Sequence, residues 1–291
     1  MRVRQVEPTS RRDVRRFIHF PFTLYRGCPQ WVPPMIADMR LAFDHHKHIF
    51  YRHSEAAFYL AESEGEVLGR LAVLDNRHYN DYHGSQVANF YFFDAVDDVA
   101  VAQALFEAAF AWARRRGLNK VIGPKGMLRG DGLGLLVEGF EHRPAMGIAY
   151  NYDYYDHLVT SQGFEKEIDY LSAYVSAEYH LPPRVYELAE KVKQRREFSI
   201  KEFANKEELR AWIPAIKRVN NEAFTDVWGY YPIDDDELNA VGQRMLAIAD
   251  HRLIKLVMKK DEVVGFMPGN SIRRGCSIPI VLPLMSLMTT S

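Results

Sequence analysis

The sequence predicts an α/β fold, a mixed sheet flanked by helices, followed by an incomplete second copy of the same arrangement. Helical and strand-like periodicities alternate along the first 175 residues. The segment 87–96, "VANFYFFDAV", is apolar at nearly every position, which is typical of a central strand buried on both faces. The segment "GEVLGRLAV" is matched by "DEVVGFMPG", with Gly69 and Gly265 in equivalent places. This match indicates an internal repeat of a whole domain.

The first elements are a short strand and two helices. Residues 2–6 alternate as a strand does, and a helix is predicted to begin after Ser10, which is a suitable N-cap. Two prolines at 33–34 open a second predicted helix, where proline is tolerated in the first turn.

A hairpin follows at 56–76, with its turn at Glu64-Gly65-Glu66 between two apolar runs. After the central strand, residues 97–117 predict a long helix that has acids at its start and arginines before Gly117 at its end, as the helix dipole favours. A short strand at 119–124, a helix ending at Gly163 and a closing strand complete the first domain.

The predicted boundaries are residues 1–178 for the first domain, 179–197 for a linker helix, 198–267 for a partial second domain and 268–291 for an irregular tail. The tail has no helical or strand period, which suggests a truncated or frame-shifted coding region. An unfinished sheet leaves an exposed edge, so we expect a homodimer formed through that edge.

Composition limits the function classes. The chain has 37 basic and 38 acidic residues, so no net field attracts nucleic acid or an anionic membrane. Two cysteines and the absence of a long apolar run predict a soluble, cytoplasmic protein. Six arginines stand in the first sixteen residues; a solvated helix face is the favoured interpretation, and a site for an acidic partner is the alternative.

Four histidines stand close together: His45, His46, His48 and His53. Their spacing matches no zinc pattern, so no metal is predicted, and a surface loop is the favoured interpretation. Substrate contact is the alternative. His53 and Glu55 adjoin the next strand and are the best placed for proton transfer.

The element order, together with "FPFTLYRGCPQWVPP", "YRHSEAAFYLA" and "YNYDYYDHLVTSQGFEKEIDYLSAY", resembles the GNAT superfamily of acyl-CoA-dependent N-acyltransferases, and in particular bacterial proteins with tandem GNAT-like domains. The resemblance covers the first 175 residues as a full domain and 198–267 as the front of a second. It implies acetyl-CoA or another acyl-CoA as co-substrate and a small-molecule amine as acceptor.

In that superfamily, backbone N–H groups between the central strand and the long helix hold the CoA pyrophosphate. The resemblance places this turn at Phe93, Asp94, Val96, Asp97, Asp98 and Val99. The usual glycines are missing, and the carboxylates repel a diphosphate. A GNAT-like fold that binds a ligand or partner without catalysis is therefore kept as the alternative function.

The resemblance also implies the remaining site residues. Glu55 or Asp94 is the candidate base, and Tyr155 is the candidate acid toward the leaving thiolate. The tyrosines at 152, 154 and 155 have packing as their alternative role. The candidate substrate contacts are His53, Asp131, Asn151 and Tyr154, of which Asp131 lies in a glycine-rich stretch that predicts a mobile loop.

Overall fold

The computed structural model describes residues 1–144, 148–171, 180–248, 250–267 and 284–290. The chain divides into two compact units. Unit 1 comprises Met1–Tyr174 and Ile278–Ser291, and unit 2 comprises Val175–Ser277. Each unit is described by itself below.

Unit 1 is built on an eight-stranded mixed sheet with the order β1-β2-β3-β4-β5-β11-β6, in which β7 also pairs with β11. β4 and β5 are parallel, and the other pairs are antiparallel. The strands are β1 (Arg2–Gln5), β2 (Glu55–Ser63), β3 (Glu66–Asp75), β4 (Val87–Ala95), β5 (Lys120–Gly123), β6 (Leu135–Glu138), β7 (Glu165–Leu171) and β11 (Leu284–Thr290).

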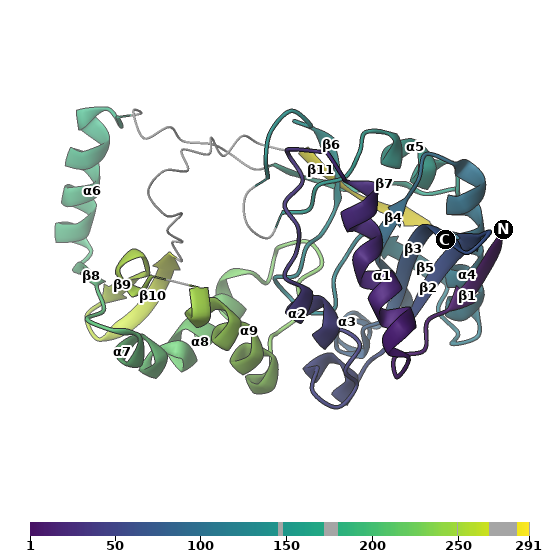
Figure 1. Cartoon of the computed structure of the whole chain (residues 1–291). Helices are drawn as coiled ribbons and strands as arrows, with labels where there is room; N and C mark the ends of the chain where they lie inside the picture. Colours follow the sequence, from purple (N-terminus) through teal and green to yellow (C-terminus); the bar gives the residue numbers. More distant parts are fainter. Residues whose placement is uncertain (145–147, 172–179, 249, 268–283, 291) are drawn as a thin grey trace. The chain divides into compact units, whose positions relative to one another are not determined.

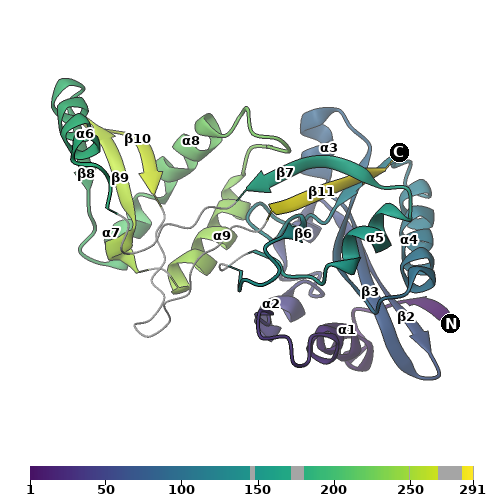
Figure 2. The ribbon, with the colours of Figure 1, turned by 90° about the horizontal axis from the view of Figure 1, so that it is seen from above.

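Helices cover both faces of this sheet (Figures 1 and 2). Successive residues of β2 belong to different core clusters: Phe58 packs with Phe17 of α1, whereas Tyr59 packs with Leu105 of α4. This alternation follows from the pleat of a strand that is buried on both faces. The helices of unit 1 are α1 (Arg11–Leu24), α2 (Ile36–Leu41), η1 (Ile49–Arg52), α3 (Arg77–His83), α4 (Val99–Arg114) and α5 (Tyr154–Thr160).

The helix starts follow the sequence. Ser10 caps α1 by accepting a hydrogen bond from the Asp13 backbone N–H, and Asp98 caps α4 by accepting one from Ala100. Each cap satisfies a backbone donor that would otherwise have no partner in the first turn.

β4 is the strand that shapes the site. It pairs with β5 over Val87–Asn89 only, and its pairing with β3 shifts register between Tyr91 and Asp94. Phe92, within that shift, has a positive φ of 49°. A bulge of this kind bends a strand and changes the direction of its side chains.

The predicted irregular tail is wrong for residues 284–290, which form β11. This strand pairs with β5, β6 and β7 within the sheet of unit 1. The tail lacks a sequence period, but unpaired strand edges in unit 1 supply backbone partners for it. Residues 268–283 lie outside the described part of the chain, so the predicted irregularity there is not tested.

Unit 2 repeats the first elements of unit 1. Its sheet has the order β10-β9-β8, and its β9–β10 hairpin shifts register near Gly265, much as the β2–β3 hairpin shifts near Gly69. β10 is an edge of this sheet among the described residues. Its elements are α6 (Pro183–Arg195), β8 (Phe198–Lys201), α7 (Lys206–Ala211), α8 (Ile213–Ala223), α9 (Asp235–Ile248), η2 (His251–Leu253), β9 (Lys255–Lys259) and β10 (Glu262–Met267).

Candidate active site

A buried ion pair stands at the end of β4. Asp94 is paired in register with Arg70 of β3, and both Nε and one terminal nitrogen of Arg70 lie 2.7 Å from Asp94 Oδ2. The side chains are 5% and 11% exposed. Arg70 also donates to the Phe17 carbonyl oxygen at 2.9 Å. A buried carboxylate of this kind requires charge compensation, and the guanidinium provides it.

Two buried tyrosines occupy the other carboxylate oxygen. The hydroxyls of Tyr25 and Tyr155 lie 3.0 and 3.2 Å from Asp94 Oδ1 and 2.9 Å from each other. Tyr155 also accepts from the Ala95 backbone N–H at 3.3 Å. Each phenol has one proton to donate, so Tyr155 donates to Asp94 while Tyr25 donates to Asp94 or to Tyr155.

Burial and the neighbouring carboxylate keep both phenols protonated. Desolvation raises the pKa of Tyr155 well above its usual value, and Asp94 raises it further. Desolvation likewise raises the pKa of Tyr25, with Tyr155 and Asp94 as further causes. A protonated phenol stabilises developing negative charge as a hydrogen-bond donor, but a phenol with a raised pKa is a weak acid and does not readily transfer its proton.

A stack of aromatic rings adjoins this network. Trp31, Tyr25, Tyr152 and Tyr154 follow one another with ring centroids 5.1, 4.9 and 5.4 Å apart. Tyr152 donates to the Leu24 carbonyl oxygen, and Tyr154 donates to that of Ala95. Tyr154 and Tyr155 of α5 therefore bond the carbonyl oxygen and the N–H of Ala95. Ala95 lies beyond Asn89, the last residue of β4 that pairs with β5. The tyrosine-rich stretch holds the strand end as well as packing against it.

The predicted cofactor turn follows directly. The Phe93 ring lies in the core against Phe106 and Tyr155, and Val96 is half-buried. Asp97, Asp98 and Val99 are exposed. Asp98 Oδ1 accepts from the Ala100 N–H at 2.8 Å, so a carboxylate of the chain already lies at the N-terminus of α4.

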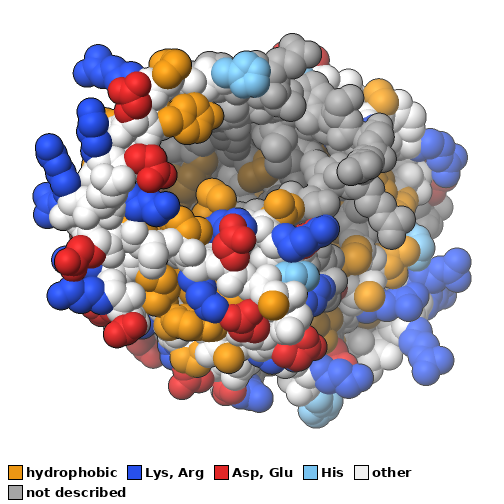
Figure 3. Space-filling view, turned by 90° about the vertical axis from the view of Figure 1, so that its left-hand side faces the viewer, with side chains coloured by type: hydrophobic (Ala, Val, Ile, Leu, Met, Phe, Trp, Pro, Cys, Tyr) orange, Lys and Arg blue, Asp and Glu red, His pale blue; other side chains and the backbone are white. Residues whose placement is uncertain are grey.

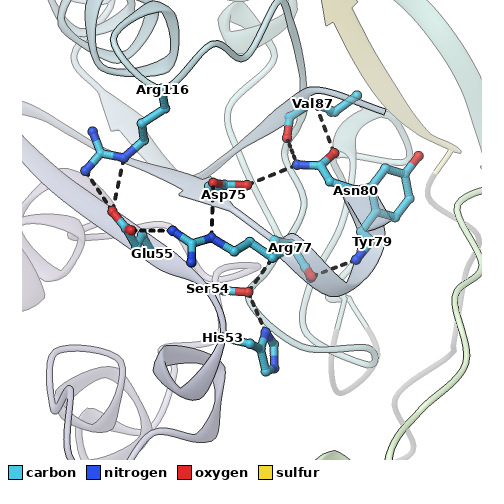
Figure 4. A network of polar contacts seen from close by, with 10 residues as sticks. His53, Ser54, Glu55, Asp75, Arg77, Tyr79, Asn80, Val87 and Arg116 are labelled. Atoms are coloured by element: carbon cyan, nitrogen blue, oxygen red, sulfur yellow. Dashed lines mark hydrogen bonds and ion pairs between the residues drawn. The ribbon is translucent and has the colours of Figure 1, made fainter. Parts of the chain in front are cut away.

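Glu55 lies in a different cluster (Figure 4). It binds Arg77 at 2.6 Å and Arg116 at 2.9 Å, and its side chain is 46% exposed. Glu55 pairs in register with Asp75, whereas Asp94 pairs with Arg70. These two β3 positions are five residues apart, about 17 Å along a strand. The structure therefore brings Asp94 and Tyr155 together beside the middle of β3 and leaves Glu55 beside Asp75, the last residue of that strand.

The predicted substrate contacts are dispersed. The His53 ring stacks on His78 with centroids 3.5 Å apart, near Glu55. Asp131 accepts from the Leu128 N–H at 2.9 Å within its loop. Asn151 is buried, and its amide bonds both backbone groups of Leu136 in β6. Of these four residues, Tyr154 lies beside the Asp94 network, because its hydroxyl donates to the Ala95 carbonyl oxygen.

The histidine stretch serves local structure. His48 is buried, and its Nδ1 accepts from the Phe50 N–H at the start of η1. The His45 ring stacks on Tyr51 with centroids 3.9 Å apart. These contacts give two of the four histidines a structural role within the described loop.

Neither Tyr25 nor Arg70 was predicted from the sequence. Arg70 had a usable signal, because it is the one charge inside the apolar run "VLGRLAVL". A charge at a position that should be buried implies a buried partner. Tyr25 had none, since its partners lie 69 and 130 residues away in sequence.

No protein-family model matches the chain. Protein YghO of Escherichia coli is 24% identical over 265 residues, which cover 89% of this chain and 66% of YghO. A bacterial ceramide synthase of Caulobacter vibrioides is 27% identical over 268 residues, which cover 88% of this chain and 67% of that protein. The chain thus spans about two thirds of the length of the curated relatives it matches.

Among solved structures, a tandem GNAT protein from the clavulanic acid biosynthesis pathway superimposes with a TM-score of 0.53 at 9% identity, covering 99% of this chain and 98% of that one. Identity this low shows the fold alone. The prediction of a tandem α/β fold with a helix-flanked mixed sheet is confirmed. The chain has the fold of the GNAT superfamily, repeated in tandem.

Proposed function

We propose that the chain is an acyl-CoA-dependent N-acyltransferase whose reaction takes place at the end of β4. The observation that carries this proposal is the buried set of Asp94, Tyr25 and Tyr155 beside the bulge at Phe92, where β4 and β5 separate. The GNAT fold supports it.

In the proposed reaction, the amine nitrogen attacks the thioester carbonyl carbon, the C–N bond forms, the C–S bond breaks and the CoA thiolate leaves. The β4 backbone around the bulge donates a hydrogen bond to the thioester oxygen. Tyr155 donates one to the developing thiolate, for which its hydroxyl turns away from Asp94. With its raised pKa, Tyr155 acts as a hydrogen-bond donor and the thiolate leaves unprotonated.

Asp94 has a positioning role in this proposal. Its Oδ2 binds Arg70 and its Oδ1 accepts from the two phenols, so in this proposal the attacking nitrogen loses its proton to water. The carboxylate orients the Tyr25 and Tyr155 hydroxyls, which replaces the role of base considered for Asp94 from the sequence. Glu55 has no part in the proposed step.

The acceptor class comes from the relatives. One of them is named a bacterial ceramide synthase, and a ceramide is a long-chain amine acylated on nitrogen. We therefore propose a long-chain amine as acceptor and a long-chain acyl-CoA, or acetyl-CoA, as donor.

A ligand- or partner-binding protein without catalysis is the second candidate, and one observation favours it. The Asp98 carboxylate holds the Ala100 N–H, and Asp97 is exposed beside it, where a pyrophosphate would bind. Two carboxylates at this place repel a diphosphate.

Thiol release from acetyl-CoA and palmitoyl-CoA, with and without long-chain amines, separates the two candidates. We expect amine-dependent release that falls about 100- to 1,000-fold in Tyr155→Phe, the range for loss of one preorganised hydrogen-bond donor to developing negative charge. Tyr152→Phe is the matched control, since the Tyr152 hydroxyl bonds Leu24.

Unfolding in the presence of CoA adds an independent readout, because CoA at about a hundred times its dissociation constant adds about 2.7 kcal/mol of stability. Absence of both thiol release and a CoA-dependent shift would exclude the transferase and leave the non-catalytic candidate.

A further inference from the structure

The outer side of α1 and α2 carries arginines that the fold itself does not use. Arg11, Arg12 and Arg15 of α1 and Arg40 of α2 are exposed. No carboxylate in the described ranges forms an ion pair with any of the four. Arg4 and Arg16 nearby differ, because both bind Glu62. The first two turns of α1 therefore contain one arginine that binds Glu62, Arg16, and three arginines that face solvent.

Two hollows adjoin these arginines. One of about 490 Å³ is lined by Arg11, Arg12, Arg15, Arg16 and His19. The other, of about 950 Å³, shares Arg11 and Arg15 and adds Arg40, His45 and His46 over a floor that includes Val14 and Phe43. Glu7 and Asp44 also line it, but Asp44 accepts from the His46 and Lys47 backbone N–H groups. The balance of charge on this surface is positive.

Helix stability does not explain the arrangement. Arg11 and Arg12 occupy the first turn of α1, where the positive end of the helix dipole disfavours cations. An external anion would be attracted by the guanidinium groups and by the helix end together. Arg11 and Arg12 thus lower the stability of the isolated helix, and a bound anionic partner would offset that loss.

Exposed apolar side chains belong to the same layer. Val32 and Met35, in the connection between α1 and α2, are 51% and 61% exposed. Trp31 beside them packs against Phe22 in α1, which holds this connection to the helix. α1 and α2 cover one side of the sheet of unit 1 (Figures 1 and 2). These two helices and the connection between them thus carry both basic groups and large exposed apolar side chains.

We propose that this α1–α2 basic surface, defined by Arg11, Arg12, Arg15, Arg40, Val32 and Met35, binds an anionic lipid bilayer. The guanidinium groups meet phospholipid headgroups, and Val32 and Met35 enter the interface. A nucleic acid would satisfy the arginines but would offer nothing to the exposed apolar side chains. Docking of this kind needs no spanning helix, and no described helix is long and apolar enough to cross a membrane.

The net charge of −1 averages over this surface and the rest of the chain, so composition alone predicts no attraction to an anionic membrane. On the face that Figure 3 shows, by contrast, basic and acidic side chains are intermixed over the described residues. The inference does not depend on acyl transfer, and its test uses no enzymatic activity.

The test is co-flotation of the full chain with vesicles of phosphatidylcholine, with and without phosphatidylglycerol. We expect binding to the anionic vesicles only, weakened by added salt. Replacing Arg11, Arg12 and Arg15 with glutamine should lower the partition coefficient roughly 100-fold, since each basic residue contributes about fivefold. Val32→Ser with Met35→Ser should lower it by a smaller factor.

The matched control replaces Arg184, Lys191 and Arg195 of α6 with glutamine, which removes the same formal charge from exposed positions in unit 2. Thermal unfolding checks that the α1 variant folds, as expected of exposed side chains that oppose the helix dipole. Absence of wild-type binding to anionic vesicles, or equal losses in the α1 and α6 variants, would overturn the proposal. So would α1-dependent binding to heparin without binding to vesicles, which would indicate a soluble acidic polymer.

Discussion

Two clusters of carboxylates and guanidinium groups lie along the same strand, β3, and they differ in burial. At one position Arg70 binds Asp94, with side chains 5% and 11% exposed. Five residues further on, the cluster around Asp75 holds Glu55 between Arg77 and Arg116, with Arg77 53% exposed. The residue types are the same, but solvent reaches only the second cluster freely.

The difference teaches that burial decides what a charged pair does. In the exposed cluster, water can replace a lost ion-pair partner at little cost, so removing one partner changes the free energy of unfolding only slightly. In the buried cluster each partner depends on the other, and the two phenols depend on both. A carboxylate can hold neighbouring hydroxyls in fixed orientations only where water does not compete for its oxygens, as in the buried cluster. We therefore infer that chemistry belongs to the Arg70–Asp94 cluster.

The largest effect is expected from Arg70→Met, which leaves Asp94 buried without its cation. The free energy of unfolding of unit 1 should fall by about 3–5 kcal/mol. Urea denaturation, with hydrogen exchange at the β4 amides to assign the loss to unit 1, measures it. Arg70→Met combined with Asp94→Leu should recover most of the loss. A single-variant loss below about 1 kcal/mol would show that Asp94 is solvated after all.

A smaller loss, about 2 kcal/mol, is expected from Tyr155→Phe, because Asp94 Oδ1 loses a donor and the Ala95 N–H loses an acceptor. Thermal unfolding should show a decrease of several degrees. Tyr154→Phe should cost less, since Tyr154 is only half-buried. Equal losses in the two variants would argue against a special role for the buried hydroxyl.

Lys125 extends the comparison to a half-buried lysine. Its Nζ lies 4.0 Å from the centroid of the Tyr79 ring, and burial lowers its pKa to about 8, with Arg129 as a further cause. Above pH 8 the folded chain releases this proton while the unfolded chain keeps it up to its usual value of 10.5, so stability should rise with pH across this window.

The rise due to Lys125 should be about 1–2 kcal/mol, because the side chain keeps some contact with water. Urea titrations at several pH values, compared with Lys125→Met, isolate its contribution from that of the tyrosines. A wild-type curve parallel to that of the variant would mean that Lys125 titrates normally.

The smallest effect is expected from Glu55→Gln, which removes an exposed acid between two arginines. The loss of stability should stay below about 1 kcal/mol and shrink further at high salt. Denaturation at low and high ionic strength measures it. If Glu55→Gln costs as much as Arg70→Met, the contrast between the two clusters fails.

The sequence was informative where local chemistry decides. Alternation along β2 and β3, the caps at Ser10 and Asp98, and the turn at Glu64-Gly65 depend on residues close together in the chain. Periodicity and capping act over one or two turns, so they can be read without the fold. Asp94 became a candidate through the resemblance to the GNAT superfamily, which places a carboxylate base at the end of the central strand.

The rest depended on contacts between distant residues. The tail at 284–290 has no period of its own, and only the strand edges of unit 1 make it β11. The dispersal of Glu55 and Asp94 follows from strand register, which sequence spacing does not reveal.

By itself, the sequence determined that this chain is a tandem α/β protein with a polar strand end before a long helix, because short-range periodicity and capping specify those elements. Only the tertiary structure decided which carboxylate is buried and which hydroxyls meet it. Tyr25, Arg70 and Tyr155 come from three separate elements, and desolvation acts only once those elements have packed around Asp94.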